Sequence, residues 1–395
     1  MRVLCIIISL VCLMIVPVRL VAVYAPIPEQ EQGKILTVYL ATGVYHDSNI
    51  FGGSVNEVSS FVYELNPSLV FNASVDAKTL VAASYRLSLD YMPDRPGKKE
   101  LDSHEFTARI AHTFTPLMSL DLSDTYQVSK NPESLLPGVA TVVNTDQSYR
   151  RNQFDARYVA GLTKRTGLVF KGRATRYDYT NAILGLSLDH NEYLFGLAAE
   201  HAVLPDLKTV LEYRHLMINY DTAGDVKDKH SDFLLIGADH AVNERLGLTG
   251  RLGAERRSRA GGANATLPYA ELGFKLDYAK GSYVAFGYSY SVEETSNIEL
   301  YSDMSVNRYF VNVQQVVLSQ LTATGSVTWE PSQLNGRAGE RDLNETNTQV
   351  GLALIYRPGN VWSVSAVFDY DHITSDDGAR KLKRARSGLS AKYVF

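Results

Sequence analysis

The amino-acid sequence predicts an all-β fold: a transmembrane, antiparallel, up-and-down β-barrel of about 18 strands, with about 16 strands as the alternative. Three observations favour this fold class. Apolar and polar residues alternate in segments of about 12 residues, short and long connections alternate along the chain, and the last strand ends on the bare aromatic Phe395. A soluble β-sandwich has shorter strands, and its turns do not sort into two length classes.

The first element is a predicted signal peptide at residues 1–25. An early arginine is followed by a largely apolar run and then by the small residues Ala22 and Ala25, which is the layout of a secretory signal. An uncleaved N-terminal anchor is the alternative. Both cysteines, Cys5 and Cys12, lie in this segment, so the rest of the chain has no thiol for a disulfide or a cysteine metal site.

Composition favours one exported body over residues 26–395, because no linker divides this part of the chain. The formal net charge is -4 and the pI is near 6.2, so the chain lacks the basic footprint of a nucleic-acid-binding protein. Tyrosine is abundant, with 24 Tyr against 14 Phe and 2 Trp, which favours strands and wet apolar interfaces. With a mean hydropathy of -0.12 and no later apolar run of about 18 residues, a helical membrane protein is excluded.

Short polar turns recur at intervals of roughly 40 residues, the length of two strands plus one long loop. We predict these turns at 72–77, 115–118, 163–167, 204–207, 242–245, 279–282, 319–321 and 357–360. The longer connections between them are rich in Asp, Asn, Gly and Ser and are predicted at 46–57, 92–103, 130–148, 180–190, 221–231, 256–265, 294–304, 332–345 and 374–381. Turns on one side and loops on the other are typical of a membrane barrel.

The strands between these connections repeat with a period of two. In one of them Trp362, Val364 and Phe368 alternate with polar residues that include Ser363 and Asp369, whereas an amphipathic helix would repeat near 3.6 residues. Counting in this way gives about 18 candidate strands. Because lipid excludes an open sheet edge, a sheet of such strands has to close on itself.

The C-terminal strand carries a predicted assembly signal. Tyr393 and Phe395 fall on one face of an extended chain and Lys392 on the other. With an even strand number both termini lie on the same side, which we predict to be the periplasm. The terminal aromatic residue resembles the signal by which the outer-membrane insertion machinery recognises its clients. The expected partners are therefore that machinery, periplasmic chaperones, outer-membrane lipid and lipopolysaccharide.

The first predicted strand runs into the segment GVYHDSNIFGG, residues 43–53. Its residues Asp47, Asn49, Ile50 and Phe51 resemble the Asp-x-Asn-Ile-aromatic signature of outer-membrane β-barrel porins of the "beta-barrel porin 2" type. The resemblance implies a barrel in the outer membrane of a diderm bacterium, acting as a channel or as a partner in envelope polysaccharide export. It implies no cofactor and identifies no solute.

The predicted inner face is charged. If the apolar residue of each pair faces lipid, charges of both signs point inward on most strands, and burying them in a dry core would cost several kcal/mol per unpaired ion. We therefore predict a wet pore, with a barrel plugged by structural ion pairs as the alternative. The predicted pore-lining residues are Arg86, Asp90, Arg109, Asp155, Arg157, Lys171, Arg173, Arg214, Arg251, Asp369, Asp371, Arg384 and Arg386.

The longest predicted connection, residues 130–148, has an apolar centre. Such a segment is too apolar for a free surface loop. We consider two arrangements: a constriction folded into the lumen, and packing across the barrel mouth. The residues concerned are Leu135, Leu136, Val139, Val142 and Val143.

An enzyme is not predicted, although Asp-His pairs occur at 189–190, 239–240 and 371–372. Neighbours on a strand point to opposite faces, so none of these pairs is a catalytic dyad. The nine histidines are scattered and form no metal-ligand pattern. A porin or channel for passive or semi-selective passage of small solutes is the leading prediction. The alternatives are the barrel of an exopolysaccharide export system, which would bind polysaccharide, and an enzyme at the barrel rim. A homo-oligomer is compatible with each of them.

Overall fold

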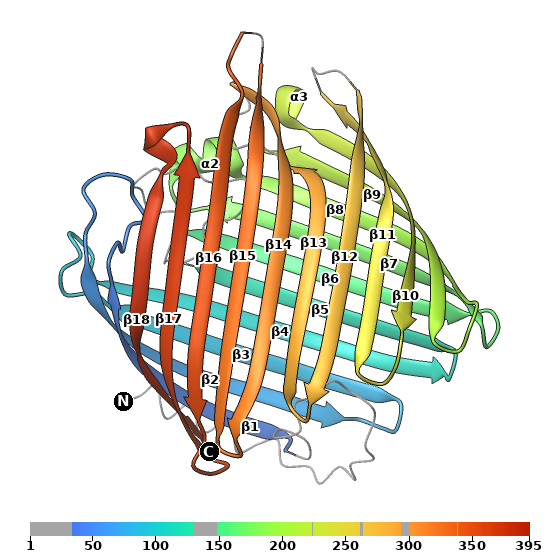
Figure 1. Ribbon diagram of the computed structural model, residues 1–395, viewed down its shortest axis with the longest axis horizontal. Coiled ribbons are helices and arrows are strands. Elements are labelled where there is room, and N and C mark those ends of the chain that lie inside the picture. The colour runs from blue at the N-terminus through green and yellow to red at the C-terminus, as the bar shows by residue number, and fades with distance from the viewer. Residues whose placement is uncertain (1–33, 130–147, 223, 261–263, 294–299, 338) are drawn as a thin grey trace.

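The computed structural model describes residues 34–129, 148–222, 224–260, 264–293, 300–337 and 339–395 as an 18-stranded antiparallel sheet (Figure 1). The strands are β1 (Leu36–Asp47), β2 (Ser60–Ser74), β3 (Thr79–Tyr91), β4 (Glu100–Thr115), β5 (Met118–Ser129), β6 (Tyr149–Gly161), β7 (Thr166–Tyr179), β8 (His190–Ala202), β9 (Leu207–Tyr220), β10 (Lys229–Ala241), β11 (Leu246–Arg259), β12 (Ala265–Ala279), β13 (Ser282–Glu293), β14 (Tyr301–Leu318), β15 (Leu321–Gly336), β16 (Leu343–Tyr356), β17 (Trp362–Ser375) and β18 (Leu382–Val394). The predicted signal peptide at 1–25 lies outside the described residues.

Each strand pairs with its neighbours in the chain, and the first strand also pairs with the last. The β1–β18 ladder runs from Tyr39 opposite Val394 to Asp47 opposite Arg386, so the sheet has no open edge. The prediction of a closed up-and-down barrel of 18 strands is confirmed, and the alternative of 16 strands is wrong. The sheet extends from residue 36 to residue 394.

The connections sort into two classes, as predicted. At one end of the barrel the turns are short, and the turn between β14 and β15 contains only residues 319–320. At the other end the connections are longer and include the helices α2 (Ala182–Leu188) and α3 (Gly224–Lys227) and the turn η1 (Gly378–Arg380). β1 begins and β18 ends at the short-turn end (Figure 1). No helix among the described residues is long and apolar enough to cross a membrane.

The outer face of the barrel carries exposed apolar side chains, because every second residue of a strand points outward. In β17, Trp362 and Val364 are exposed, and the Trp362 ring packs against Tyr393 of β18 with centroids 4.6 Å apart. Toward the other end, Tyr309 and Trp329 stack with centroids 5.2 Å apart. An apolar band with aromatic residues near its edges is typical of a surface in contact with lipid.

The inner face is not uniformly polar, and this corrects the simple inference that the apolar residue of each pair faces outward. Met304, Val306, Leu334 and Leu343 form a buried cluster near the long-loop end of β14–β16. Because these residues share an inner face with the buried carboxylate Glu330, apolar packing fills part of the barrel wall there.

Candidate functional site: the inner face of the barrel

The strand register places all the predicted pore-lining residues on the face opposite the exposed apolar side chains. In a closed barrel this is the inner face. That these side chains line a conducting path remains a prediction. The residues are Arg86, Asp90, Arg109, Asp155, Arg157, Lys171, Arg173, Arg214, Arg251, Asp369, Asp371, Arg384 and Arg386.

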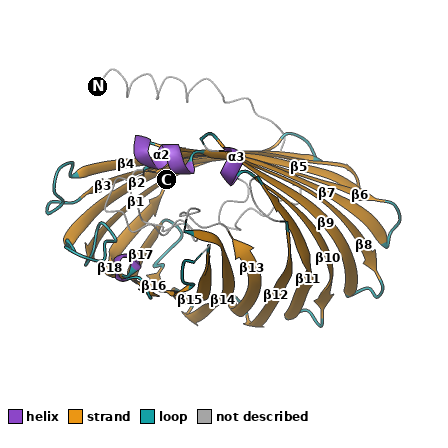
Figure 2. Cartoon of the chain, turned by 90° about the horizontal axis from the view of Figure 1, so that it is seen from above, coloured by secondary structure: helices purple, strands orange, loops and turns teal. Residues whose placement is uncertain are grey.

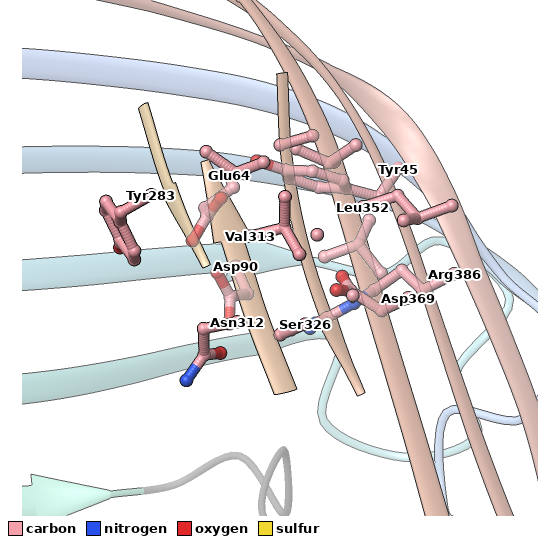
Figure 3. A pocket seen from close by; sticks show the side chains of 16 residues that line it. Tyr45, Glu64, Asp90, Tyr283, Asn312, Val313, Ser326, Leu352, Asp369 and Arg386 are labelled. Carbon is pink, nitrogen blue, oxygen red and sulfur yellow. The ribbon is translucent and has the colours of Figure 1, made fainter. Parts of the chain in front are cut away.

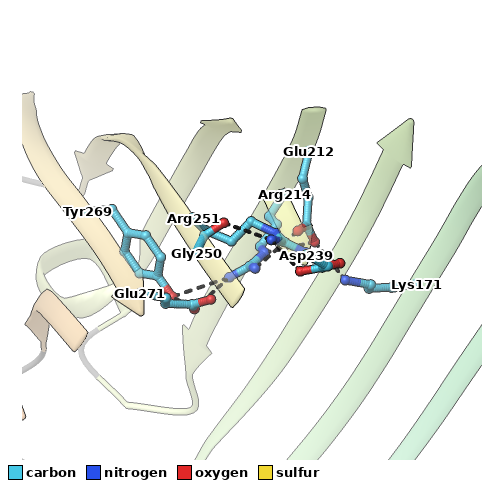
Figure 4. Close-up of polar contacts among 8 residues, drawn as sticks. All are labelled: Lys171, Glu212, Arg214, Asp239, Gly250, Arg251, Tyr269 and Glu271. Carbon is cyan, nitrogen blue, oxygen red and sulfur yellow. Dashed lines mark hydrogen bonds and ion pairs between the residues drawn. The ribbon is translucent and has the colours of Figure 1, made fainter. Parts of the chain in front are cut away.

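A chain of ion pairs crosses the inner face from β7 to β12 (Figure 4). Its centre is Glu212, which is only 2 % exposed. Lys171 Nζ lies 2.9 Å from Glu212 Oε1, and Arg214 Nε lies 3.0 Å from the same oxygen. Arg214 also reaches Glu271, with Nη1 3.4 Å from Oε1, and Glu271 accepts a hydrogen bond from Tyr269. The buried carboxylate of Glu212 is thus held by two cations, as low-dielectric surroundings require.

Further pairs extend this charged wall toward β4. Arg109 Nε donates to Asp121 Oδ1 at 2.9 Å, and Arg173 Nε donates to Asp155 Oδ1 at 2.7 Å. Arg157 lies between these pairs, opposite Asp121 in the register, and its side chain is exposed to the lumen. The cations and carboxylates of this charged wall therefore largely neutralise one another.

The inner positions of β13–β16 form a second wall of different chemistry, which the sequence analysis did not single out. They carry hydroxyl and amide groups over most of their length: Tyr283, Ser289, Asn312, Gln314, Thr322, Thr324, Ser326, Thr328 and Gln349. Among the described inner positions of these four strands, charges occur only near the long-loop end, at Glu293, Arg308, Glu330 and Glu345.

Two cavities lie against the inner face. A cavity of ≈ 420 Å³ touches Glu64 and Asp90 on one side and Asn312 and Ser326 on the other (Figure 3). A second cavity of ≈ 600 Å³ also touches Glu64 and Asp90 and continues toward β4 and β5. From above, the ring of strands is longer in one direction than in the other (Figure 2). The first cavity therefore bridges the lumen between strands that are not neighbours in the sheet.

The residues of the family-like motif fasten β1 to β18. Asp47 is 0 % exposed, and its two carboxylate oxygens accept hydrogen bonds from Arg384 Nε at 3.1 and 3.0 Å. Ser48 exchanges hydrogen bonds with Ala385 through Ser48 N and Ser48 Oγ, at 3.0 and 2.8 Å. Asn49 Nδ2 donates to the carbonyl of Lys383 at 3.2 Å. We call Asp47, Ser48, Asn49 and Arg384 the closing contact.

The closing contact changes the reading of Arg384. It lies on the inner face, as predicted, and opposite Asp371 in the register. Its side chain is only 7 % exposed, however, because it is turned toward Asp47. Arg384 is therefore part of a buried ion pair and not of the open wall, whereas Arg386 pairs with Asp369 at 3.6 Å and stays more accessible.

The apolar half of the motif packs inside the barrel mouth. Ile50 is buried with Val62, Met92 and Leu101, and Phe51 packs against this cluster. The segment after β1 is thus anchored at both its polar and its apolar residues.

The two terminal aromatic residues lie on the outer face, as the alternation predicted. The Tyr393 and Phe395 rings meet edge to face with centroids 4.7 Å apart, and Phe395 is 63 % exposed. Phe395 N donates to Val38 O at 2.9 Å, which continues the ladder to the last residue. Their role as an assembly signal remains a prediction. The proposed constriction residues Leu135, Leu136, Val139, Val142 and Val143 lie outside the described residues.

An acidic group at the long-loop end was also missed by the sequence analysis. Asp178, Asp189 and Asp221 come together there. Arg176 lies among them and donates to Asp221 Oδ1 at 2.6 Å and to Asp178 Oδ1 at 2.9 Å. The hydrogen bond from Arg176 lowers the pKa of the Asp221 carboxyl. Arg176 pairs with two of these carboxylates, and the third, Asp189, accepts a hydrogen bond from the backbone N–H of Tyr179 at 2.7 Å. We therefore assign no metal to them.

The sequence-adjacent Asp-His pairs do not form dyads. Asp239 contacts Arg251 on the inner face at 2.8 Å, while His240 lies on the outer side, with Nδ1 3.2 Å from Asp206 O. The outer face instead brings together residues that the sequence separates. Asp232 Oδ1 accepts from Tyr213 at 2.6 Å and lies 2.8 Å from His215 Nδ1. A period of two gives the face of each residue but not its cross-strand partner, so no sequence signal predicted this group.

Comparison with known proteins shows that the fold of this chain is similar to that of solved β-barrel structures. No family model matches the chain, and no curated protein matches it in sequence. The iron transporter FrpB of Neisseria meningitidis (F5-1 variant, apoprotein form) matches with a TM-score of 0.50 and 10 % identity, over 92 % of this chain and 81 % of FrpB. OccAB3 of Acinetobacter baumannii gives 0.49 and 12 %, over 91 % and 98 % of the two chains. OpdK of Pseudomonas aeruginosa with vanillate gives 0.48 and 10 %, over 91 % and 98 %. At this identity, the likeness to FrpB shows the β-barrel fold alone.

Proposed function

We propose that this protein is an outer-membrane channel for the passage of small polar solutes. The observation that carries the proposal is the inversion of polarity across a closed barrel. The outer face is apolar along strands such as β17, while the inner face carries cross-strand ion pairs and a wall of hydroxyl and amide groups. Barrels with about 16 to 18 strands leave an aqueous lumen.

The proposal includes an orientation and a set of partners. The short turns and both ends of the barrel sheet would face the periplasm, and the long connections would face the exterior, where they meet lipopolysaccharide. Phe395 would be read by the insertion machinery. The resemblance of Asp47, Asn49, Ile50 and Phe51 to "beta-barrel porin 2" proteins supports a porin.

The test is ion conduction by the purified, refolded protein in planar lipid bilayers. Folding is checked first by heat-modifiable migration on gels, since a closed barrel resists unheated detergent. We expect discrete conductance steps that grow with salt concentration, because dissolved ions in the aqueous lumen carry the current. A folded barrel that stays silent would instead indicate a lumen plugged by its ion pairs.

A further inference from the structure

Two neighbouring rows of inner side chains, most of which line the cavity of ≈ 420 Å³, cross the strands from β14 to β1 (Figure 3). The residues of each row lie directly opposite one another on successive strands, and on β16–β18 the two rows are two residues apart. We call them the polar row and the apolar row. The polar row consists of Asn312, Ser326, Gly351, Asp369 and Arg386, and the apolar row of Ala353, Val367, Gly388 and Tyr45.

The polar row presents hydrogen-bonding groups to the lumen. Ser326 is exposed and Asn312 is half-buried, and in the part of the chain that the structure describes neither side chain has a hydrogen-bond partner. A Cβ at Gly351 would lie 2.8 Å from Ser326 Oγ and 3.4 Å from Asp369 Oδ1. Because glycine has no Cβ, this point of the wall is open. A solute hydroxyl placed there meets a hydroxyl and a carboxylate at once.

The apolar row ends on an aromatic ring that lies along the wall. Tyr45 Cε2 lies 2.5 Å from the position of a Cβ at Gly43, and Tyr45 Cδ1 lies 2.6 Å from the position of a Cβ at Gly388. The ring thus rests on the backbone of two glycines. Since Tyr45 is only half-buried and lines the cavity, its other face is open to a solute. Ala353 and Val367 line the same cavity without a polar side-chain group.

The charged side of the cavity does not favour a solute of one sign. Glu64 and Asp90 lie there, and the adjoining cavity of ≈ 600 Å³ touches the same two carboxylates. The lining of that second cavity also holds cations, namely Arg86, Arg386 and Lys392. Charges of both signs therefore lie close together, and the class of solute follows from the two rows.

We propose that this cavity binds neutral saccharides. A pyranose ring carries C–H groups on its faces and hydroxyl groups around its edge, so it matches an apolar row that lies beside a polar one. Its C–H groups are attracted to the negative face of the Tyr45 ring. Its hydroxyls donate to Asp369 and accept from Arg386, while Asn312 and Ser326 can do both. This inference rests on the proposed channel function and adds the class of solute.

The experiment compares a double variant with a matched control. Asn312→Leu with Ser326→Ala removes an amide and a hydroxyl that lie opposite one another in the β14–β15 register. Gln349→Leu with Thr328→Val removes the same two kinds of group from an opposite pair on β15 and β16, outside the lining of this cavity. Neither variant changes the net charge, so a difference between them reports position. Heat-modifiable migration on gels checks that each barrel is folded.

Gly351→Ala provides an independent test, so that the result does not depend on one variant. Its methyl group occupies the open point between Ser326 Oγ and Asp369 Oδ1, while the hydroxyl and the carboxylate are kept. We expect the barrel to fold, because the nearest atom is the end of a short side chain that can rotate. Binding of the saccharide should nevertheless weaken, since a solute hydroxyl can no longer reach that point.

The first readout is interruption of the ion current by maltotriose in planar bilayers, where the concentration for half block reports affinity. We expect this concentration to rise about fivefold or more in both cavity variants, because hydrogen bonds to the solute are lost, and to change by less than about twofold in the control. Tetraethylene glycol, which is neutral but has no sugar ring, should block weakly. Equal weakening in the control, no weakening in the cavity variants, or equal block by tetraethylene glycol would overturn the inference and leave the channel function intact.

The second readout does not need conduction. Saturation-transfer NMR on the detergent-solubilised barrel should show signals of bound maltotriose, which are reduced in the cavity variants and kept in the control. If the wild-type protein is silent in bilayers but binds maltotriose in this way, the channel function fails and the saccharide site survives. If the wild-type protein does not bind maltotriose, the saccharide site is wrong whether or not the barrel conducts.

Discussion

At the scale of single residues, the pair Asp47–Arg384 differs from most other inner ion pairs, because both of its side chains are buried. Most inner pairs are partly exposed, and exposed pairs contribute only about 0–1 kcal/mol. Asp47 is fully buried and is also bonded by the backbone N–H of Asn49 at 2.9 Å. Removing one partner of a buried pair leaves an uncompensated charge, which costs about 3–5 kcal/mol.

We therefore predict that Asp47→Ala lowers the free energy of unfolding by about 3–5 kcal/mol, measured as the urea midpoint of the refolded barrel. Arg386→Ala is the control, since Arg386 lies two residues away on the same strand as Arg384 and its pair with Asp369 is longer, at 3.6 Å. It should cost no more than about 1 kcal/mol. Equal losses in the two variants would show that burial of the first pair does not matter.

At the scale of strands, the β1–β18 ladder depends on the absence of a side chain at Gly388. A Cβ at this position would lie 2.2 Å from the carbonyl oxygen of Val44 on the neighbouring strand. The Tyr45 ring covers Gly43 on its own strand and approaches Gly388 on the next. Glycine at both positions thus lets one aromatic ring lie flat over the junction of the first and last strands.

Gly388→Ala is predicted to destabilise the barrel by about 1–3 kcal/mol, because backbone atoms have to move to admit the methyl group. Gly247→Ala in β11 is the matched control, since a Cβ there meets nothing within 4 Å. Urea midpoints of both variants measure the difference. If Gly247→Ala is destabilised as much as Gly388→Ala, then replacing a strand glycine lowers stability in general, and the close approach to Val44 is not the cause.

The last strand also carries the predicted assembly signal. Phe395→Ala should reduce the heat-modifiable species in the outer membrane and leave protein in the periplasm, because the terminal aromatic group is then missing. Leu389→Ala removes an apolar side chain of similar exposure, 62 % against 63 %, from the same outer face, and should assemble normally. The fraction in each compartment is measured by immunoblotting. Normal assembly of Phe395→Ala would remove the terminus from consideration as a signal.

The period of two predicted the strands and their faces well, since it is a local property of the chain. It could not predict pairs such as Asp47 with Arg384, which depend on where the barrel closes. It also fails where both faces are apolar, as in Tyr309-Phe310-Val311, and the structure turns Phe310 inward over Gly287. The uncharged wall was not predicted because the pore-lining residues were selected by their charge, and serine and threonine carry none.

At the scale of the whole molecule, the two ends of the barrel differ in the length of their connections. This asymmetry predicts which end faces the cell exterior. Arg341 lies in a long connection and Asn360 in a short turn, and both are exposed. Beyond residue 25 the chain has no cysteine, so single cysteines can be introduced without a background.

Arg341→Cys is predicted to react with a membrane-impermeant maleimide on intact cells, and Asn360→Cys to react only after the outer membrane is permeabilised. Labelling is measured on the purified protein after each treatment. Permeabilised cells provide the control, because both positions should then label. If only Asn360→Cys reacts on intact cells, the orientation of the barrel is the reverse of the predicted one.

The closing contact joins residues that are 337 positions apart in the chain, and this has a consequence for the order of assembly. Bringing such distant segments together costs about 5 kcal/mol in loop-closure entropy. Only the contacts between the first and last strands offset this cost, and a sheet without its last strand does not form them. Until the last strand arrives, the growing sheet exposes two unpaired edges, each able to pair with another chain. Loss of β18 would therefore produce an aggregating chain and not a narrower barrel, and the nascent protein has to be kept apart from its copies until its final residue is in place.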